Sequence, residues 1–226
     1  MDWQVWQDAY DNPDSALARR LRAVQARIRD ALDDAPPGPL RVVSLCAGQG
    51  RDLLEVLAEH PRRADVRARL VELDERNADC ARETIRAFGL HQVEMVTGDA
   101  SLTDHYQGMT PADLVLVCGL FGNITDPDIE RVIDTCPQLC ATGGIVVWTR
   151  HRKPPDRVPL ICDRFERRGF ELQWLSDPDA GFGLGAHRFA GTPEPLVAGQ
   201  HMFRFVGYDR LRVGEAQGAQ RPDLER

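Results

Sequence analysis

The chain has 226 residues, of which 42% are hydrophobic and 28% charged, and its formal net charge at pH 7 is −7. This size suits one well-cored domain. The acidic balance argues against a general nucleic-acid-binding protein, which usually carries a basic excess. No apolar run approaches the roughly 20 residues that span a bilayer, and the opening lacks a basic-then-apolar signal layout, so we expect a cytoplasmic protein without a membrane partner.

The hydrophobic pattern predicts alternating helices and strands. The predicted helices cover residues 15–33, 51–60, 75–88, 126–141 and 158–169. The predicted strands cover residues 40–46, 66–74, 93–97, 113–120, 144–150, 170–175 and 201–208. The glycine-rich stretch "GFGLGAHRF" is expected to form a mobile loop between the last two strands.

This alternation predicts a Rossmann-like, doubly wound α/β fold, in which a seven-stranded, mostly parallel sheet carries helices on both faces. We expect a single domain over residues 1–214, with an N-terminal helical cap of about residues 1–35, and a polar tail over residues 215–226. Such a sheet binds its ligand at the carboxyl ends of its strands.

The six cysteines fall mostly within apolar runs, and no two of them form a C-x-x-C pair. This favours buried, reduced thiols over a redox or metal role. We therefore expect no metal site.

The stretch "VVSLCAGQGRD", residues 42–52, directly follows the first predicted strand. It lacks the lysine of a phosphate-binding P-loop, and Leu53 stands where a dinucleotide fingerprint needs a small residue. What remains is a two-glycine loop and an acid, Glu72, at the end of the second strand. This arrangement suits a ribose held by a carboxylate beside a loop with no pyrophosphate to bind, and it disfavours a nicotinamide dehydrogenase.

From residue 41 to about residue 150 the chain resembles the class I S-adenosylmethionine-dependent methyltransferases. In order, "VVSLCAGQGRD", "RLVELDERN", "VTGDAS" and "ADLVLVCGLFGNI" resemble the first four motifs of that family, and "GGIVVWTR" its fifth strand. The details "WQDAYDNPDS", "CGLFGNITD" and "GAHRF" resemble a small bacterial branch of putative methyltransferases.

The resemblance implies S-adenosylmethionine as cofactor and S-adenosylhomocysteine as product. It places Glu72 on the ribose hydroxyls, Asp99 on the adenine amino group and the Ala100 amide against the ring. The full set that it places at the cofactor is Ser44, Cys46, Ala47, Gly48, Gly50, Glu72, Leu73, Asp99, Ala100, Cys118 and Gly119. Ser44 stands where the family usually has an acid that orders the loop and the amino group of the methionine, and Cys46 where it has its first glycine, so other groups must replace that contact.

Two histidines are candidates for a general base, since imidazole titrates near neutral pH. His151 directly follows the fifth strand, and His187 lies in the glycine-rich stretch, where it could move with a lid. A solvated basic turn around His151 and a bracing role for His187 remain the alternatives.

Three further residues are candidates for the acceptor side of the site. Tyr10 could belong to an aromatic lid or cover a core edge, and Asn123 could contact the ligand or shape a turn. Arg150 belongs to a cationic group that could hold a substrate anion or form a solvated face. The role of Asp52 stays open between helix cap and site entrance.

The sequence thus predicts a methyltransferase that acts on a small-molecule acceptor by direct in-line transfer without a metal. The acidic charge and the lack of an evident appended recognition domain favour a small acceptor, with its pocket walled by the N-terminal helix and the loop before the last strand, and make a nucleic-acid partner unlikely. The alternatives are a non-catalytic S-adenosylmethionine-binding or regulatory protein and, with less support, an RNA methyltransferase. The pattern specifies no oligomeric state.

Overall fold

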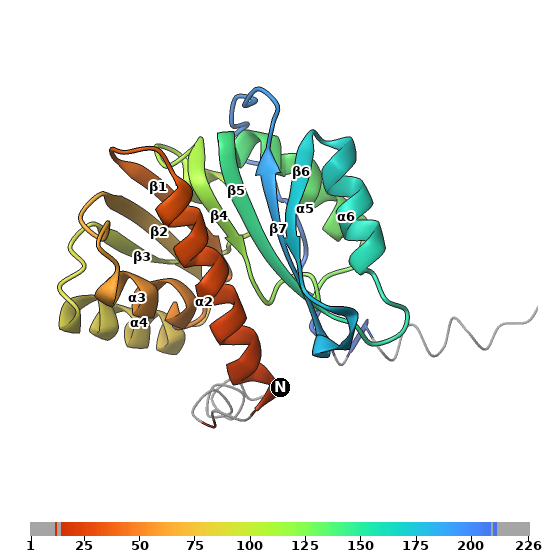
Figure 1. Ribbon diagram of the computed structural model, residues 1–226, viewed down its shortest axis with the longest axis horizontal. Helices are drawn as coiled ribbons and strands as arrows, with labels where there is room; N and C mark the ends of the chain where they lie inside the picture. The colour runs from red at the N-terminus through yellow and green to blue at the C-terminus, as the bar shows by residue number, and fades with distance from the viewer. Residues whose placement is uncertain (1–11, 13–14, 209, 212–226) are drawn as a thin grey trace, which may run out of the picture.

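The computed structural model describes residues 12, 15–208 and 210–211, and Figure 1 shows their arrangement. Seven strands form one sheet in the order β3-β2-β1-β4-β5-β7-β6. The strands are β1 (Leu40–Leu45), β2 (Val66–Glu72), β3 (Val93–Thr97), β4 (Ala112–Val117), β5 (Cys140–His151), β6 (Phe170–Leu175) and β7 (Phe182–Phe189). Strands β1 to β5 are parallel, whereas β7 runs antiparallel to both β5 and β6. The predicted doubly wound, mostly parallel seven-stranded sheet is confirmed.

Helices cover both faces of the sheet. They are α2 (Ala16–Asp34), α3 (Arg51–Glu59), α4 (Glu75–Ala87), α5 (Asp126–Leu139) and α6 (Val158–Arg167), with short 3₁₀ turns at Thr103–Tyr106 and Pro178–Ala180. One apolar core joins α2, α3 and α4 to the sheet, and a second joins α5 and α6 to it. Figure 1 shows α2 crossing the near face of the sheet, whereas α5 and α6 lie side by side at the end of the sheet that carries β6 and β7.

Two helix starts follow the capping signals of the sequence. The Ser15 hydroxyl accepts from the Ala18 amide at 2.9 Å and begins α2. The Asp74 carboxylate accepts from the amides of Arg76 and Asn77 and begins α4. Side chains of this kind replace the carbonyl partners that the first amides of a helix lack.

The last strand was placed wrongly by the sequence pattern. The glycine-rich stretch forms β7, and residues 201–208 form no strand. The glycines of β7 serve close packing: a Cβ at Gly183 would lie 2.3 Å from Val158 Cγ2, and one at Gly185 would lie 2.5 Å from the Trp148 ring. They therefore mark a tightly covered strand and not a mobile loop.

Residues 200–208, which we call the C-terminal strap, cross the carboxyl ends of the parallel strands. At one end the Met202 amide donates to the Ser101 carbonyl at 2.9 Å. At the other end the Tyr208 amide donates to Asn123 Oδ1 at 3.1 Å, and the Val206 amide to the Asn123 carbonyl at 2.9 Å. The strap thus spans from the segment after β3 to the segment after β4.

Across the residues that the structure describes, no helix has both the length and the apolar character that crossing a membrane requires.

Candidate active site

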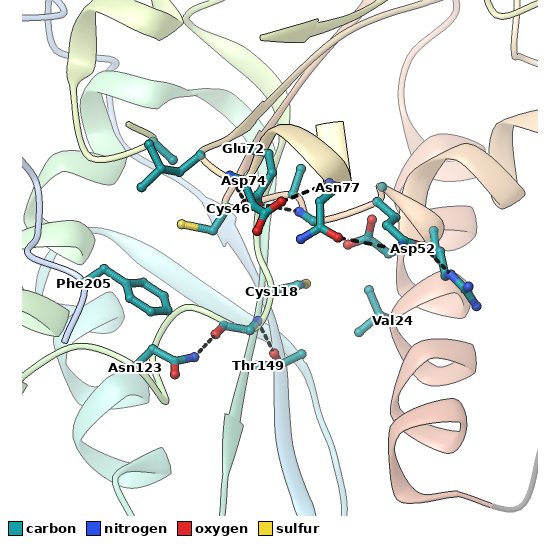
Figure 2. A pocket seen from close by; sticks show the side chains of 18 of the residues that line it. Val24, Cys46, Asp52, Glu72, Asp74, Asn77, Cys118, Asn123, Thr149 and Phe205 are labelled. Carbon is teal, nitrogen blue, oxygen red and sulfur yellow. Dashed lines mark hydrogen bonds between the residues drawn. The ribbon is translucent and has the colours of Figure 1, made fainter. Parts of the chain in front are cut away.

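A cavity of about 400 Å³ lies at the carboxyl ends of β1 to β5, between α2 and the strap. Figure 2 shows side chains from these elements converging on it. Of the residues expected at a cofactor, the cavity is lined by Cys46, Ala47, Gly48, Gly50, Glu72, Leu73, Asp99, Ala100, Cys118 and Gly119. Parallel strands deliver these residues to one edge because their carboxyl ends coincide.

The loop after β1 is fixed to the carboxylate of Glu72. Glu72 Oε2 accepts from the Gly48 amide at 2.8 Å, and Oε1 accepts from the Asp74 amide at 2.9 Å. A carboxylate has about four lone-pair positions, so both oxygens can still accept hydroxyl protons from a ligand. The side chain is thereby held rigidly at the rim of the cavity.

Cys46 adopts a left-handed backbone conformation, with φ at 51°. Glycine adopts this conformation at little cost, whereas a residue with a Cβ is strained in it. Burial raises the pKa of the Cys46 thiol well above its usual range, and the nearby Glu72 and Asp99 carboxylates raise it further. The thiol therefore stays protonated and offers an apolar, polarisable wall.

The residue that follows Glu72 in the chain is an exposed leucine. Leu73 is 68% exposed although it is a large aliphatic residue, and it lines the cavity. Asp99 lines the same end, and its Oδ1 accepts from the Ser101 amide at 2.9 Å. An exposed leucine next to carboxylates suits the face of a flat ring with polar edges.

The floor of the cavity is the end of β4. The Gly119 amide donates to Thr149 Oγ1 at 2.8 Å, which ties this end to β5. Asn123 Nδ2 donates to the Gly119 carbonyl at 2.7 Å, while Oδ1 accepts from the strap. Asn123 thus lines the cavity and holds the strap at the same time.

Asp52 faces the cavity from the first turn of α3 (Figure 2). Burial raises the pKa of its carboxyl to about 6 against the opposing hydrogen bonds from the amides of Leu53 and of Asp52 itself. The negative charge of Glu55 adds to the rise, and the positive charge of Arg20 opposes it. A carboxylate that is costly to ionise at the wall of a cavity is typical of a functional group.

Two residues predicted for the site, Ser44 and Arg150, do not line the cavity. Ser44 is buried inside β1, next to Leu70 of β2 and Leu116 of β4, and does not line the cavity. Arg150 is buried and donates to the Phe121 carbonyl, so it braces the turn after β4 and presents no free charge to an acceptor. Tyr10 lies outside the described residues.

Neither histidine lines the cavity. His187 is fully buried within β7, where its Nδ1 accepts from Trp148 Nε1 at 3.0 Å and its ring stacks on Phe165 of α6. The expectation of a histidine in a mobile lid is therefore wrong, because this imidazole belongs to the core under α6. His151 lies at the end of β5, and the centroid of its ring is 5.0 Å from that of Tyr208, the last residue of the strap.

Several lining residues were not singled out by the sequence. They are Arg20, Leu21, Val24, Gln49, Arg51, Asp74, Asn77, Thr149, Phe203 and Phe205. A signal existed for the two phenylalanines, since their two-residue spacing in "HMFRF" does put them on one side of an extended segment. The α2 residues gave a weaker signal, because an apolar stripe with arginines beside it also describes any surface helix.

This strand order, with β7 antiparallel beside β5, and the cavity at the carboxyl ends of the strands are those of a Rossmann-like methyltransferase fold. Residues 16–162 match the family model described as "Putative methyltransferase", and the chain belongs to this family. It is also 30% identical over 140 residues to "Uncharacterized protein YnbC" of Escherichia coli (strain K12). That match spans 59% of this chain but 23% of the relative.

Solved structures show the same fold. An O-methyltransferase family protein from Burkholderia thailandensis superimposes with a TM-score of 0.58 at 19% identity, over 77% of this chain and 58% of that one. A TehB-like SAM-dependent methyltransferase from Corynebacterium glutamicum does so with a TM-score of 0.54 at 18% identity, over 76% of this chain and 96% of that one.

Proposed function

We propose that the cavity binds S-adenosylmethionine and positions its methyl group for transfer to a small-molecule acceptor. The observation that carries this proposal is the carboxylate of Glu72, fixed by two backbone amides between the glycine loop and the exposed Leu73. The residues present fit the donor: Glu72 would hold the ribose hydroxyls, and Asp99 would accept from the adenine amino group. Leu73 and Ala100 would flank the ring. The volume, about 400 Å³, falls within the usual range for small-ligand pockets.

S-adenosylmethionine, when bound, supplies an electrophilic methyl group on its sulfonium. The chain's own contribution is to align the acceptor with that methyl group and to exclude water. Phe203 and Phe205 of the strap form an apolar wall for this purpose, and Asn123 holds the strap in place. His151 does not line the cavity, but its ring lies 5.0 Å from that of Tyr208 in the strap, and it stays our candidate for receiving a proton from an acceptor that carries one.

A small acceptor is favoured by the position of the cavity between two elements of the fold. The helix α2 stands on one side of it and the strap on another, so an acceptor must fit between them. The net charge of −7 weakens the alternative of an RNA acceptor, whose phosphates would be repelled.

Calorimetric titration with S-adenosylmethionine, S-adenosylhomocysteine and NAD tests the donor. We expect the first two to bind and NAD to give no heat, and Glu72→Gln to weaken S-adenosylhomocysteine about tenfold or more, because a charge-assisted contact is lost. Glu83→Gln, an exposed change on α4, is the matched control and keeps the wild-type affinity.

A methyl-transfer assay tests whether the acceptor is a small molecule. The protein is incubated with methyl-labelled donor and a cell extract that ultrafiltration has divided into small molecules and macromolecules. We expect label to be transferred in the small-molecule fraction. Transfer only to the RNA or protein of the other fraction contradicts the small-acceptor proposal, and absence of donor binding by folded protein contradicts the donor site.

A further inference from the structure

One part of the cavity has hydrocarbon walls that the proposed donor contacts at Glu72 and Asp99 do not use. Its lining comes from α2, from the segment after β4 and from the strap. These residues, which we call the apolar half of the cavity, are Leu21, Val24, Cys118, Phe203 and Phe205. Figure 2 shows Val24 and Phe205 on opposite sides of the cavity, with Cys118 between them in this view. Walls of this kind select a ligand with an apolar surface.

Phe205 lines the cavity although it is a large aromatic residue with 44% of its surface exposed. It lies two residues after Phe203, which also lines the cavity. Backbone hydrogen bonds to Ser101 and to Asn123 fix the strap on both sides of these two rings. An exposed aromatic ring on a fixed segment at the wall of a cavity is a preformed contact surface for a ligand.

The polar side chains next to the apolar half are already bound to the protein backbone. Asn123 Nδ2 donates to the Gly119 carbonyl at 2.7 Å, and its Oδ1 accepts from the Tyr208 amide at 3.1 Å. Thr149 Oγ1 accepts from the Gly119 amide at 2.8 Å. Each polar atom of these two side chains has a partner within the protein, so a ligand that offers none leaves them satisfied. An apolar group can therefore fill this half of the cavity without that cost.

The charges around the cavity disfavour an ionised acceptor. Four acidic side chains and two arginines line it, and they are Asp52, Glu72, Asp74, Asp99, Arg20 and Arg51. This excess of negative charge repels carboxylates and phosphates. A cationic acceptor would lie next to the positive sulfonium of the donor, and like charges at close range repel as well. An uncharged acceptor avoids both costs.

We propose that the acceptor is an uncharged molecule with a flat apolar ring, which packs between Phe205 of the strap and the aliphatic face of α2. This inference rests on the proposed function, which places the donor at Glu72 and leaves the apolar half to the acceptor. Leu21 and Val24 are three residues apart on α2, so their side chains form one aliphatic surface. A flat ring can contact this surface with one face and Phe205 with the other, and an aromatic pair gains more than its buried area alone provides.

Four probes of similar size test the ring and its charge. They are 2-naphthol, its saturated counterpart decahydro-2-naphthol, the anion 2-naphthoate and the cation 2-naphthylmethylammonium. Each is titrated calorimetrically at pH 7 into protein saturated with S-adenosylhomocysteine. We expect 2-naphthol to bind about fivefold or more tightly than each of the other three. Equal or tighter binding of decahydro-2-naphthol overturns the flat ring, and equal or tighter binding of either ion overturns the uncharged acceptor.

Variants of Phe205 test the proposed wall. Phe205→Ala should weaken 2-naphthol about fivefold or more, whereas Phe205→Tyr keeps the ring and should stay within about twofold of wild type. Phe88→Ala is the matched control, because it removes a phenylalanine that is 38% exposed at the end of α4 and does not line the cavity. The affinity for S-adenosylhomocysteine, measured in the same variants, should stay within about threefold of wild type and shows that each variant is folded. Equal 2-naphthol affinity in Phe205→Ala and Phe88→Ala overturns the role of Phe205.

Methyl transfer is the second measurement. The small-molecule extract is divided by ion exchange into charged and uncharged portions before the labelled donor is added, and we expect transfer in the uncharged portion. Transfer only in a charged portion, or binding of S-adenosylhomocysteine without binding of any of the four probes, overturns the uncharged ring and leaves the donor site intact. A folded wild-type protein that does not bind S-adenosylhomocysteine overturns the proposed function, and with it the assignment of the apolar half to an acceptor.

Discussion

The imidazole of His187 shows how one residue can be misread from its neighbours in sequence. Nearby glycines suggested mobility, yet Gly183 and Gly185 make room for Val158 and Trp148, and the imidazole is enclosed by aromatic rings. Its Nδ1 accepts from Trp148, so the neutral form fits the core. Burial lowers the pKa of His187 to about 4.

This buried histidine predicts an acid-sensitive fold. The pKa of His187 is lower in the folded state, at about 4, than in an unfolded chain, at about 6.5, so unfolding takes up a proton between these two pH values. The free energy of unfolding therefore falls as pH drops through this window, by up to about 3 kcal/mol from this residue. Urea unfolding of wild type and His187→Gln between pH 7 and 4 is the measurement.

The Gln variant keeps an acceptor for the Trp148 indole and cannot ionise, so it should lose less stability on acidification than wild type. The exposed His91→Gln serves as control and should follow wild type. Parallel pH profiles for wild type and His187→Gln would show that His187 is not the acid-sensitive group.

At the scale of elements, hydrophobic periodicity predicted the five helices α2 to α6 and six of the seven strands, but neither 3₁₀ helix. It failed at the last strand because two segments competed for one role. "HMFRFVGY" has the alternation of a strand but no free place beside β5, which β7 occupies. The glycines of β7 made this segment look like a loop in the sequence. They are needed because Trp148 and Val158, which are distant in sequence, pack closely against β7, and a local sequence pattern does not show such contacts.

The residues of the site also fall into those that a local sequence pattern predicts and those that depend on long-range packing. Motif order was enough to predict the loop after β1, Glu72 and Asp99 as neighbours, because parallel strands place such residues at one edge. The contributions of α2 and the strap depend on how distant segments fold back over that edge. Arg20 and Phe205 are therefore visible only in three dimensions.

The strap gives a prediction of its own. Asn123 Oδ1 accepts from the Tyr208 amide, a bond worth about 1 kcal/mol, so Asn123→Ala should open the strap several-fold more often. The exposed Arg204 and Arg210 provide trypsin sites there, and cleavage after them, followed by mass spectrometry, should be faster in the variant. Asn123→Asp keeps the acceptor for Tyr208 but turns a carboxylate oxygen toward the Gly119 carbonyl, so it should also be cleaved faster than wild type. Identical rates for Ala and wild type would show that Asn123 does not hold the strap.

At the scale of the whole molecule, the cavity joins segments that otherwise belong to different cores. The helix α2 packs with α3 and α4 on one core, while Phe203 of the strap belongs to the core under α5 and α6. A ligand that fills the cavity contacts both groups at once. Binding should thus couple α2, the glycine loop and the strap, while β6, at the far edge of the sheet, takes no part.

This coupling predicts a regional response to S-adenosylhomocysteine. At a free concentration about 100 times Kd the ligand should stabilise the fold by about 2.7 kcal/mol, a rise in Tm of roughly 5–10 °C. Amide hydrogen exchange should slow most in residues 46–52, 72–77 and 200–208, and least in β6, because only the former surround the ligand. Glu72→Gln, with about tenfold weaker binding, meets the same ligand concentration at about 10 times its Kd, so its stabilisation should fall to about 1.4 kcal/mol. If amide hydrogen exchange in the strap does not slow, the ligand does not reach Phe205. The wall of the acceptor pocket would then have to be formed by other residues at the rim of the cavity.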